Sequence, residues 1–265
     1  MANHYTTNKD AWKALADIDY FGMFVKAYIP FNAWLNVTYP QYKRDREKIN
    51  AIKRETNPFR SKIYSLLDSV SQEGTNFRNN IGELHYLLEN HYIFNQDNRI
   101  TFSNIILGRN PDNVKEDSYR GIGFRVQYGN GGTDTHTNCL IKNKKGVAIF
   151  HREQDSYNLL ELKSCPDFIA LKEEYKSRLI NCYELVTPDL KRNLLDGFDA
   201  EKEDQFYLMG RFKFIREKEY VAQGLIEILY NMRNSLFHGE LIPDKDVNRV
   251  YGAAYKLLRE LIEAL

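Results

Sequence analysis

Arg233, Asn234 and His238 stand close together in the segment ILYNMRNSLFHGELIP, residues 228–243. An imidazole gains and loses protons near neutral pH, so a histidine can act as a general base or acid. A guanidinium is a planar, permanently charged donor that binds phosphate groups through paired hydrogen bonds. An amide one helical turn before a histidine can hold the ring in one orientation. These residue types therefore indicate proton transfer beside a bound anion, provided that the surrounding helix brings them together.

Residues 225–238 predict a helix with an apolar face and a separate polar row. The apolar face is formed by Leu225, Leu229, Met232 and Leu236. The polar row, with spacings of four, three and four, is formed by Glu227, Asn231, Asn234 and His238. Arg233 lies on neither stripe, although its long side chain can swing toward the row or toward a partner chain. Gly239 fits the position just past a helix end, and Pro243 prevents continuation.

A structural role explains the same residues without any chemistry. Arginine and histidine near a helix C-terminus stabilise the macrodipole and bond the last carbonyl groups. In a chain with six histidines and this many arginines, an arginine followed four to six positions later by a histidine is expected about once by chance. The pattern occurs again at Arg78, Asn79 and His85, where no glycine follows and the predicted helix continues. A helical interaction protein in which Arg233 and His238 only cap a helix therefore stays open as an alternative.

The segment YNMRNSLFHGELIPDKD, residues 230–246, resembles the signature of the HEPN superfamily (higher eukaryotes and prokaryotes nucleotide-binding domains). That signature is an arginine, usually followed by a polar residue, and a histidine four to six positions after the arginine, near the end of a long helix in an α-helical bundle. Arg233, Asn234 and His238 match it, and the apolar residues before them resemble those of bacterial members. With Gly239 and the final segment VYGAAYKLLRELIEAL, the match covers roughly the last fifty residues.

The resemblance implies a metal-independent endoribonuclease without a cofactor, of a kind found among toxins and antiviral defence effectors. Arg233, Asn234 and His238 are then the catalytic residues, and RNA is cut by its own 2′-hydroxyl attacking the adjacent phosphorus. His238 moves protons, Arg233 holds the phosphate, and Asn234 orients the ring or binds the 2′-hydroxyl. Glu227 and Asn231 are expected to support these groups from farther along the polar row.

The resemblance also implies partners. HEPN proteins typically dimerise with the two motifs facing each other, so we expect a homodimer, an RNA substrate, and an antitoxin or regulatory protein. Some HEPN domains have lost cleavage and bind a nucleotide or a protein partner, which is the alternative function. Certain toxins carry a tyrosine two positions after the histidine as a site for inactivating nucleotide transfer. Glu240 occupies that position here, which puts this form of control in doubt.

The charge composition limits how this protein could bind RNA. The chain has 37 Lys and Arg against 36 Asp and Glu, so no global basic field exists and RNA contacts must come from a local patch. The segment RFKFIREK, residues 211–218, alternates basic and aromatic side chains, and we expect Arg211, Lys213 and Arg216 to contact RNA. The charged segment KRDREK, residues 43–48, is expected to be a solvated helix face.

Three widely spaced cysteines predict neither a metal site nor disulfides, and we expect a cytoplasmic protein with no membrane span or signal peptide.

Three regions are predicted along the chain. Residues 1–98 read as helices, residues 99–153 as a β-rich insertion with strands at RITFSNIIL, YRGIGFRVQYG, TNCLIKN and GVAIFHRE, and residues 154–265 as the HEPN-like bundle. TPDLKRNLL is expected to be a short helix and residues 197–213 an irregular connector. The predicted fold class is therefore mainly α: a helical bundle with a small inserted antiparallel sheet.

Overall fold

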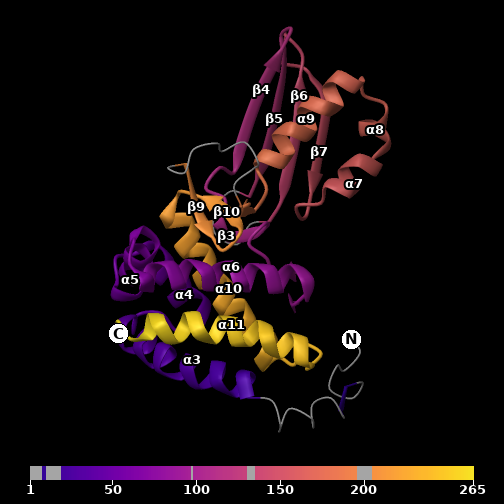
Figure 1. Cartoon of the computed structure of the whole chain (residues 1–265). Helices are drawn as coiled ribbons and strands as arrows, with labels where there is room; N and C mark the ends of the chain where they lie inside the picture. The colour runs from indigo at the N-terminus through magenta and orange to yellow at the C-terminus, as the bar shows by residue number, and fades with distance from the viewer. Residues whose placement is uncertain (1–7, 10–18, 97, 130–134, 196–204) are drawn as a thin grey trace. The chain divides into compact units, whose positions relative to one another are not determined.

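The computed structural model describes residues 8–9, 19–96, 98–129, 135–195 and 205–265 (Figure 1). It divides the chain into two compact units: unit 1 comprises Met1–Leu107 with Lys191–Leu265, and unit 2 comprises Gly108–Leu190. The chain thus leaves unit 1, builds unit 2 and returns. Strands β3 (Ile105–Arg109) and β8 (Asp189–Arg192), through which it leaves and returns, pair with each other.

The prediction of a mainly α fold with one small sheet is wrong. Within the described residues the protein is about 52% helical and 21% strand, with ten strands in four separate sheets, so it is a mixed α/β fold. Strand β8 lies in TPDLKRNLL, which we predicted as a helix. The hairpin of β9 (Phe206–Met209) and β10 (Phe212–Ile215) begins in the predicted connector and ends two residues beyond it. These short strands are held by partners distant in sequence or by a tight turn, here with Gly210 at φ +61°, so local periodicity does not reveal them.

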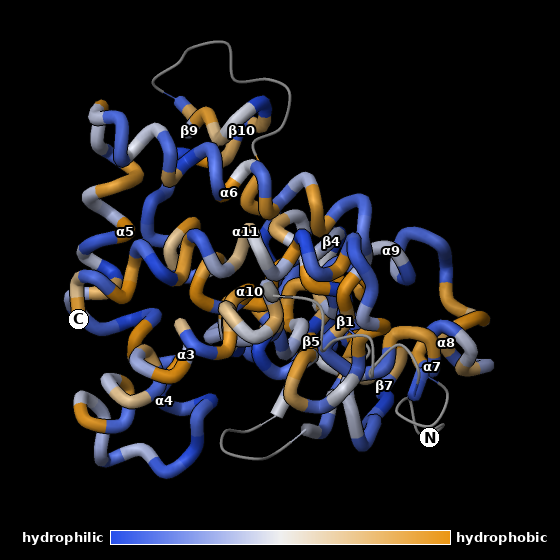
Figure 2. The backbone as a smooth tube through the Cα atoms, turned by 60° about the horizontal axis from the view of Figure 1, so that its bottom comes forward, coloured by the Kyte–Doolittle hydropathy of each residue, from blue (hydrophilic) through white to orange (hydrophobic). Residues whose placement is uncertain are grey.

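Unit 1 is a group of helices with two hairpins. Its helices and the strands of its first hairpin are α3 (Asp19–Thr38), α4 (Asp45–Arg54), α5 (Pro58–Asp68), α6 (Gln72–Asn90), β1 (Phe94–Asn95), β2 (Asn98–Arg99), α10 (Lys218–Phe237) and α11 (Lys245–Ile262). Helix α11 packs along α3 and α6, and α10 contacts α4 and α5 (Figure 1). Helix α10 lies among the other helices of this unit (Figure 2), and most of its buried residues are apolar.

Local sequence explains where several of these helices begin and end. The Asn57 side chain accepts from the backbone N–H of Arg60 at the start of α5, and Asp244 caps α11 in the same way. Helix α10 ends at Phe237, His238 is its C-cap residue, and Gly239 follows at φ +65°. The predicted end of this helix is confirmed, because glycine takes the left-handed conformation without a Cβ penalty.

Helix α3 continues past Pro30, which lies inside it. Residues 10–18, part of the predicted helical region 1–98, lie outside the described residues. Aromatic rings hold α3 in the core: Phe24 meets Tyr251 of α11 edge-on, and Phe31 packs on Phe59 of α5. The hydroxyl of Tyr251 donates to the carbonyl of Met232, which ties α11 to α10 one residue before the arginine of the motif.

Unit 2 is a four-stranded antiparallel sheet in the order β4-β5-β6-β7, with helices against one face. Its strands are β4 (Val114–Tyr119), β5 (Ile122–Tyr128), β6 (Thr137–Lys142) and β7 (Ala148–Gln154), and its helices are α7 (Leu159–Ser164), α8 (Pro166–Ile169) and α9 (Glu173–Leu185). Alternate side chains such as Phe124 and Ile141 point to the helices, which is the period of a half-buried sheet. All three cysteines are free and buried here.

The structure therefore groups the chain differently from the three predicted regions 1–98, 99–153 and 154–265. Helices α7–α9, which we placed with the C-terminal bundle, cover the sheet of unit 2. Helices from residues before 98 pack with α10 and α11 instead. Among the helices that the structure describes, none combines the length and apolarity needed to cross a bilayer.

Two helical glycines provide a matched test of this packing. A Cβ on Gly82 of α6 would meet the backbone carbonyl of Met209 far inside van der Waals contact, whereas a Cβ on Gly22 of α3 would meet nothing. We expect Gly82→Ala to lower the free energy of unfolding by about 2–3 kcal/mol, because a backbone obstacle cannot rotate away. Gly22→Ala should raise it by roughly 0.5–1 kcal/mol through helix propensity. Urea unfolding measures both, and equal effects would contradict the close approach of α6 to the β9–β10 hairpin.

Candidate functional site

The motif residues lie at the carboxyl end of α10. Nη1 of Arg233 donates to Oδ1 of Asn234 at 3.0 Å, so these two side chains are in contact. Asn234 is buried, and its backbone carbonyl accepts the N–H of His238 at 2.9 Å. The side chain of His238 is exposed, and within the described residues it has no hydrogen bond or ion pair. The structure thus brings Arg233 and Asn234 together and leaves the imidazole free in solvent one turn later.

Arg233 is held on several sides. Its Nη2 lies 3.5 Å from Oδ2 of Asp45, at the start of α4. Its guanidinium carbon lies 4.7 Å from the ring centroid of Phe237 and 5.8 Å from that of Tyr28. Its Nε is buried without a partner in the described structure. The guanidinium is therefore oriented by aromatic faces and one half-exposed carboxylate, a kind of contact that weakly favours one geometry.

Glu227, predicted as a supporting group, forms a buried ion pair. Its Oε2 lies 2.7 Å from Nζ of Lys53, and the two side chains are 4% and 2% exposed. Its other oxygen accepts from Nη1 of Arg46 at 2.6 Å. Burial lowers the pKa of Lys53, and the facing carboxylate of Glu227 opposes that shift. Because eleven residues, or about 16 Å of helix, separate Glu227 from His238, it acts on the position of α4 rather than on the imidazole.

Asn231, the second supporting residue, joins three elements. Its Oδ1 accepts from Nδ2 of Asn95 in β1 at 3.0 Å and lies 3.5 Å from Nη2 of Arg46 in α4. Next to it, the backbone N–H of Gln96 donates to Oε2 of Glu240 at 2.7 Å. The β1–β2 hairpin is therefore fastened beside the end of α10. Glu240, which stands where certain toxins carry a tyrosine, serves as an acceptor for this hairpin.

The basic segment 211–218 is not brought to the motif. Arg211 lies over the ring of Tyr86 at 4.7 Å, Lys213 over Phe206 at 4.6 Å, and Arg216 over Tyr207 at 5.1 Å. These cations are in contact with aromatic rings of the chain itself. The segment ends where α10 begins, so the length of that helix, about 30 Å, separates it from His238. An RNA contact by these three residues stays a prediction, and it belongs to a different part of unit 1.

The second arginine–histidine pattern has a structural position. Arg78 donates from Nη1 to the carbonyls of Leu66, Leu67 and Ser69, at 3.2, 3.0 and 2.7 Å, and so caps the end of α5. His85 is 3% exposed. The rings that meet it edge-on are those of Phe102, Phe212 and Phe214. Burial lowers the pKa of His85, with Glu89 opposing. An imidazole buried among phenylalanine rings in this way is a structural part of the core.

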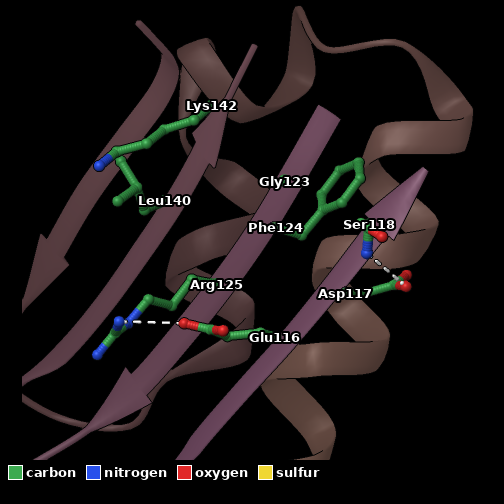
Figure 3. Close-up of a pocket in the computed structure, with 8 residues that line it drawn as sticks. All are labelled: Glu116, Asp117, Ser118, Gly123, Phe124, Arg125, Leu140 and Lys142. Atoms are coloured by element: carbon green, nitrogen blue, oxygen red, sulfur yellow. Dashed lines mark hydrogen bonds and ion pairs between the residues drawn. The ribbon is translucent and has the colours of Figure 1, made fainter. Parts of the chain in front are cut away.

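A shallow hollow of about 600 Å³ lies on the sheet of unit 2 (Figure 3). Within it, Nη1 of Arg125 donates to Oε1 of Glu116 at 3.1 Å, and Oδ1 of Asp117 accepts the backbone N–H of Ser118 at 2.7 Å (Figure 3). The other carboxylate oxygen of Asp117 accepts from Arg178 at 2.7 Å. These paired charges stabilise the sheet and α9, and none of the motif residues lies here, so the end of α10 is the stronger candidate.

Sequence reasoning missed the contribution of α4. The segment KRDREK was expected to be a solvated face, yet Asp45 and Arg46 contact α10. Farther along α4, Lys53 is buried. One signal was available: Lys53 follows Ile49 by four positions, on the face that α4 buries. A lysine on an apolar helix face needs a carboxylate partner, because an unpaired charge there is costly.

The buried ion pair gives a stability prediction. We expect Glu227→Gln to lower the free energy of unfolding by about 3–5 kcal/mol, because Lys53 is left buried without its counter-charge. The double variant Lys53→Met/Glu227→Leu should lose much less, since both charges are gone. Urea unfolding of the wild type, Lys53→Met, Glu227→Leu and the double variant measures the coupling. Strictly additive losses would mean that the two residues do not form the pair described here.

His85 gives a pH prediction. Its pKa in the folded state is below the ordinary value of 6.5, so below that pH the unfolded chain binds a proton that the folded chain does not. Stability should therefore fall as the pH drops through and below about 6.5, by up to ~1.4 kcal/mol per pH unit from this residue. Urea midpoints of the wild type and His85→Leu, compared between neutral and mildly acidic pH, should diverge. Parallel curves would exclude the effect.

Comparisons with known proteins do not assign a family. No protein-family model matches the chain, and comparison with curated proteins and with solved structures finds no significant similarity. The function must therefore be inferred from the side chains that this chain places at the end of α10.

Proposed function

We propose that the protein is a metal-independent endoribonuclease that resembles HEPN ribonucleases and acts as a homodimer in the cytoplasm, as a toxin or antiviral defence effector. One observation carries the proposal: the bonded pair Arg233–Asn234 at the end of α10, followed one turn later by the exposed imidazole of His238. A cation, an oriented amide and a free proton carrier are the groups that RNA cleavage requires.

The reaction assigned to these groups is an internal transesterification. A base removes the proton of the 2′-hydroxyl, whose oxygen attacks the adjacent phosphorus while the bond to the 5′-oxygen breaks. The leaving oxygen takes up a proton, and the products are a 2′,3′-cyclic phosphate and a 5′-hydroxyl. His238 serves proton transfer, and Arg233 stabilises the negative charge that grows on the phosphate oxygens. Asn234, bonded to Arg233, holds the guanidinium in place.

The homodimer follows from the needs of this reaction. It requires one proton to be removed and one to be delivered, and the site of one chain offers a single histidine. A second copy related by a two-fold axis supplies a second His238 and a second Arg233. Beside the motif, Phe237 and Ile242 are 57% and 59% exposed, and such apolar side chains are favourably buried against a partner.

The alternative is a non-catalytic module that binds a nucleotide or a regulatory protein through the same face. The contact between Arg233 and Asp45 favours it, because an arginine that already faces a carboxylate is less available to a scissile phosphate. Cleavage of labelled RNA in the presence of EDTA separates the two, since only the nuclease gives products.

Substitutions at the motif test the proposal. We expect His238→Ala to reduce the cleavage rate by about 10²–10⁴-fold, because proton transfer is lost. Arg233→Ala should cost about 10²–10³-fold, because the charge on the phosphate loses its donor. The rates are measured with end-labelled RNA in EDTA, with product ends identified by chemistry specific for cyclic phosphate.

His151→Ala provides the matched control, because His151 is an exposed histidine on the sheet of unit 2. It should cleave as the wild type does. The nuclease proposal fails if purified, folded wild-type protein leaves RNA intact, or if Arg233→Ala and His238→Ala retain full activity.

A further inference from the structure

Arg46 stands beside the motif although it lies far from it in sequence. It projects from the first turn of α4, and its guanidinium carbon lies 4.3 Å from the ring centroid of Tyr230 on α10. Nη1 binds Glu227 at 2.6 Å, and Nη2 lies 3.5 Å from Oδ1 of Asn231. Stacking and two polar contacts thus hold the planar group in one orientation, as recognition of a phosphate requires.

The guanidinium has donors to spare. It carries five N–H groups, and the two contacts above use only part of them. The side chain of Arg46 is 43% exposed, in contrast to the buried Lys53. Because Lys53 already neutralises the single negative charge of Glu227, the positive charge of Arg46 is not balanced by this carboxylate. The three cations Arg46, Lys53 and Arg233 against the two carboxylates Asp45 and Glu227 leave one net positive charge.

The two arginines are placed in series along α10. Arg46 contacts Asn231, and Arg233 contacts Asn234, and these two asparagines are three residues apart, or about 4.5 Å along the helix axis. The buried hydroxyl of Tyr28 interacts electrostatically with both guanidinium groups. Burial raises the pKa of Tyr28, and the charges of Arg233 and Arg46 oppose this shift. The row of asparagines therefore separates two guanidinium groups by roughly one helical turn.

We propose that Arg46 is a second phosphate-binding residue of this site, which holds the phosphate next to the scissile one in a single RNA strand. Arg233 binds the scissile phosphate, and Arg46 binds its neighbour and so sets the direction of the strand along α10. The inference rests on the proposed function for its class of ligand, and it assigns to α4 a part in substrate binding that the motif alone does not contain.

Asp45 adjusts the strength of this site. Its carboxylate lies 3.5 Å from Nη2 of Arg233 and competes with a phosphate for that donor. An incoming phosphate must displace this half-exposed contact, which is worth little by itself. Removing the charge of Asp45 should therefore strengthen RNA binding, whereas removing the charge of Arg46 should weaken it. Two neighbouring residues of one helix turn thus have effects of opposite sign.

The experiment measures binding without cleavage. A fluorescent single-stranded oligonucleotide with 2′-O-methyl groups has no free 2′-hydroxyl and stays intact, and its dissociation constant is read by anisotropy between about 50 and 200 mM salt. The proteins are the wild type, Arg46→Met, Asp45→Asn and Arg44→Met. Arg44 is exposed and is the N-cap residue of α4, two residues before Arg46, so its variant loses the same charge next to the same turn. Urea midpoints show that each variant is folded.

We expect Arg46→Met to weaken binding at least fivefold and to reduce the slope of log K against log salt by about 0.7, the value for one phosphate contact to a single strand. Arg44→Met should bind like the wild type, and Asp45→Asn more tightly. The inference is overturned if Arg46→Met and Arg44→Met weaken binding equally, if Arg46→Met has no effect, or if the wild type does not bind.

The same variants distinguish this inference from the proposed nuclease. Binding that depends on Arg46 but is accompanied by no cleavage of unmodified RNA would retain the phosphate site and reject the nuclease. Cleavage that is unchanged in Arg46→Met would retain the nuclease and reject the second phosphate site.

Discussion

The ion pair between Lys53 and Glu227 fixes where α4 lies against α10, and the other contacts of the candidate site depend on that placement. Both side chains are buried, so neither tolerates the absence of the other. Lys53 also donates to the carbonyl of Leu107 at 2.9 Å, at the end of unit 1 before the chain enters unit 2. One buried charge thus joins α4, α10 and β3. A pair of this kind stabilises less than apolar residues of the same size, but it specifies which helices meet and in which register.

The placement of α4 against α10 changes the set of charged groups at the candidate site. The motif alone contributes one arginine and one histidine, with an asparagine between them. Helix α4 adds a second arginine, Arg46, and a carboxylate, Asp45. The end of α10 therefore presents two guanidinium groups, and Asp45 lies beside that of Arg233. The affinity for an anion then depends on the balance among three partly exposed groups, of which Arg233 is the most enclosed. Each is solvated enough to exchange partners, which suits a site that binds and releases a polyanion.

The helical parts of unit 1 were largely readable from local sequence because caps and apolar periodicity act over a few residues. The end of α10 at Gly239 and the inward face of that helix are examples. Strands β8, β9 and β10 were not readable, because strands this short are stabilised by the partner across the ladder and not by their own periodicity. Strand β4, VKEDSY, was missed for the same reason: it is a charged outer strand of its sheet, and only pairing with β5 identifies it. These strands overturned the mainly α prediction.

By itself, the sequence determined the candidate residues Arg233, Asn234 and His238, the helix that carries them and the point where it ends, since each depends on neighbours within two turns. The tertiary structure decided which of them meet other elements. It showed that Asn231 binds the β1–β2 hairpin, that Glu227 is committed to Lys53, and that His85 of the second pattern is enclosed by phenylalanines. It also brought Arg46 to the motif across 181 residues of chain. Spacing along one helix predicts contacts within that helix, but contacts between distant segments depend on how the whole core packs, which no local pattern encodes.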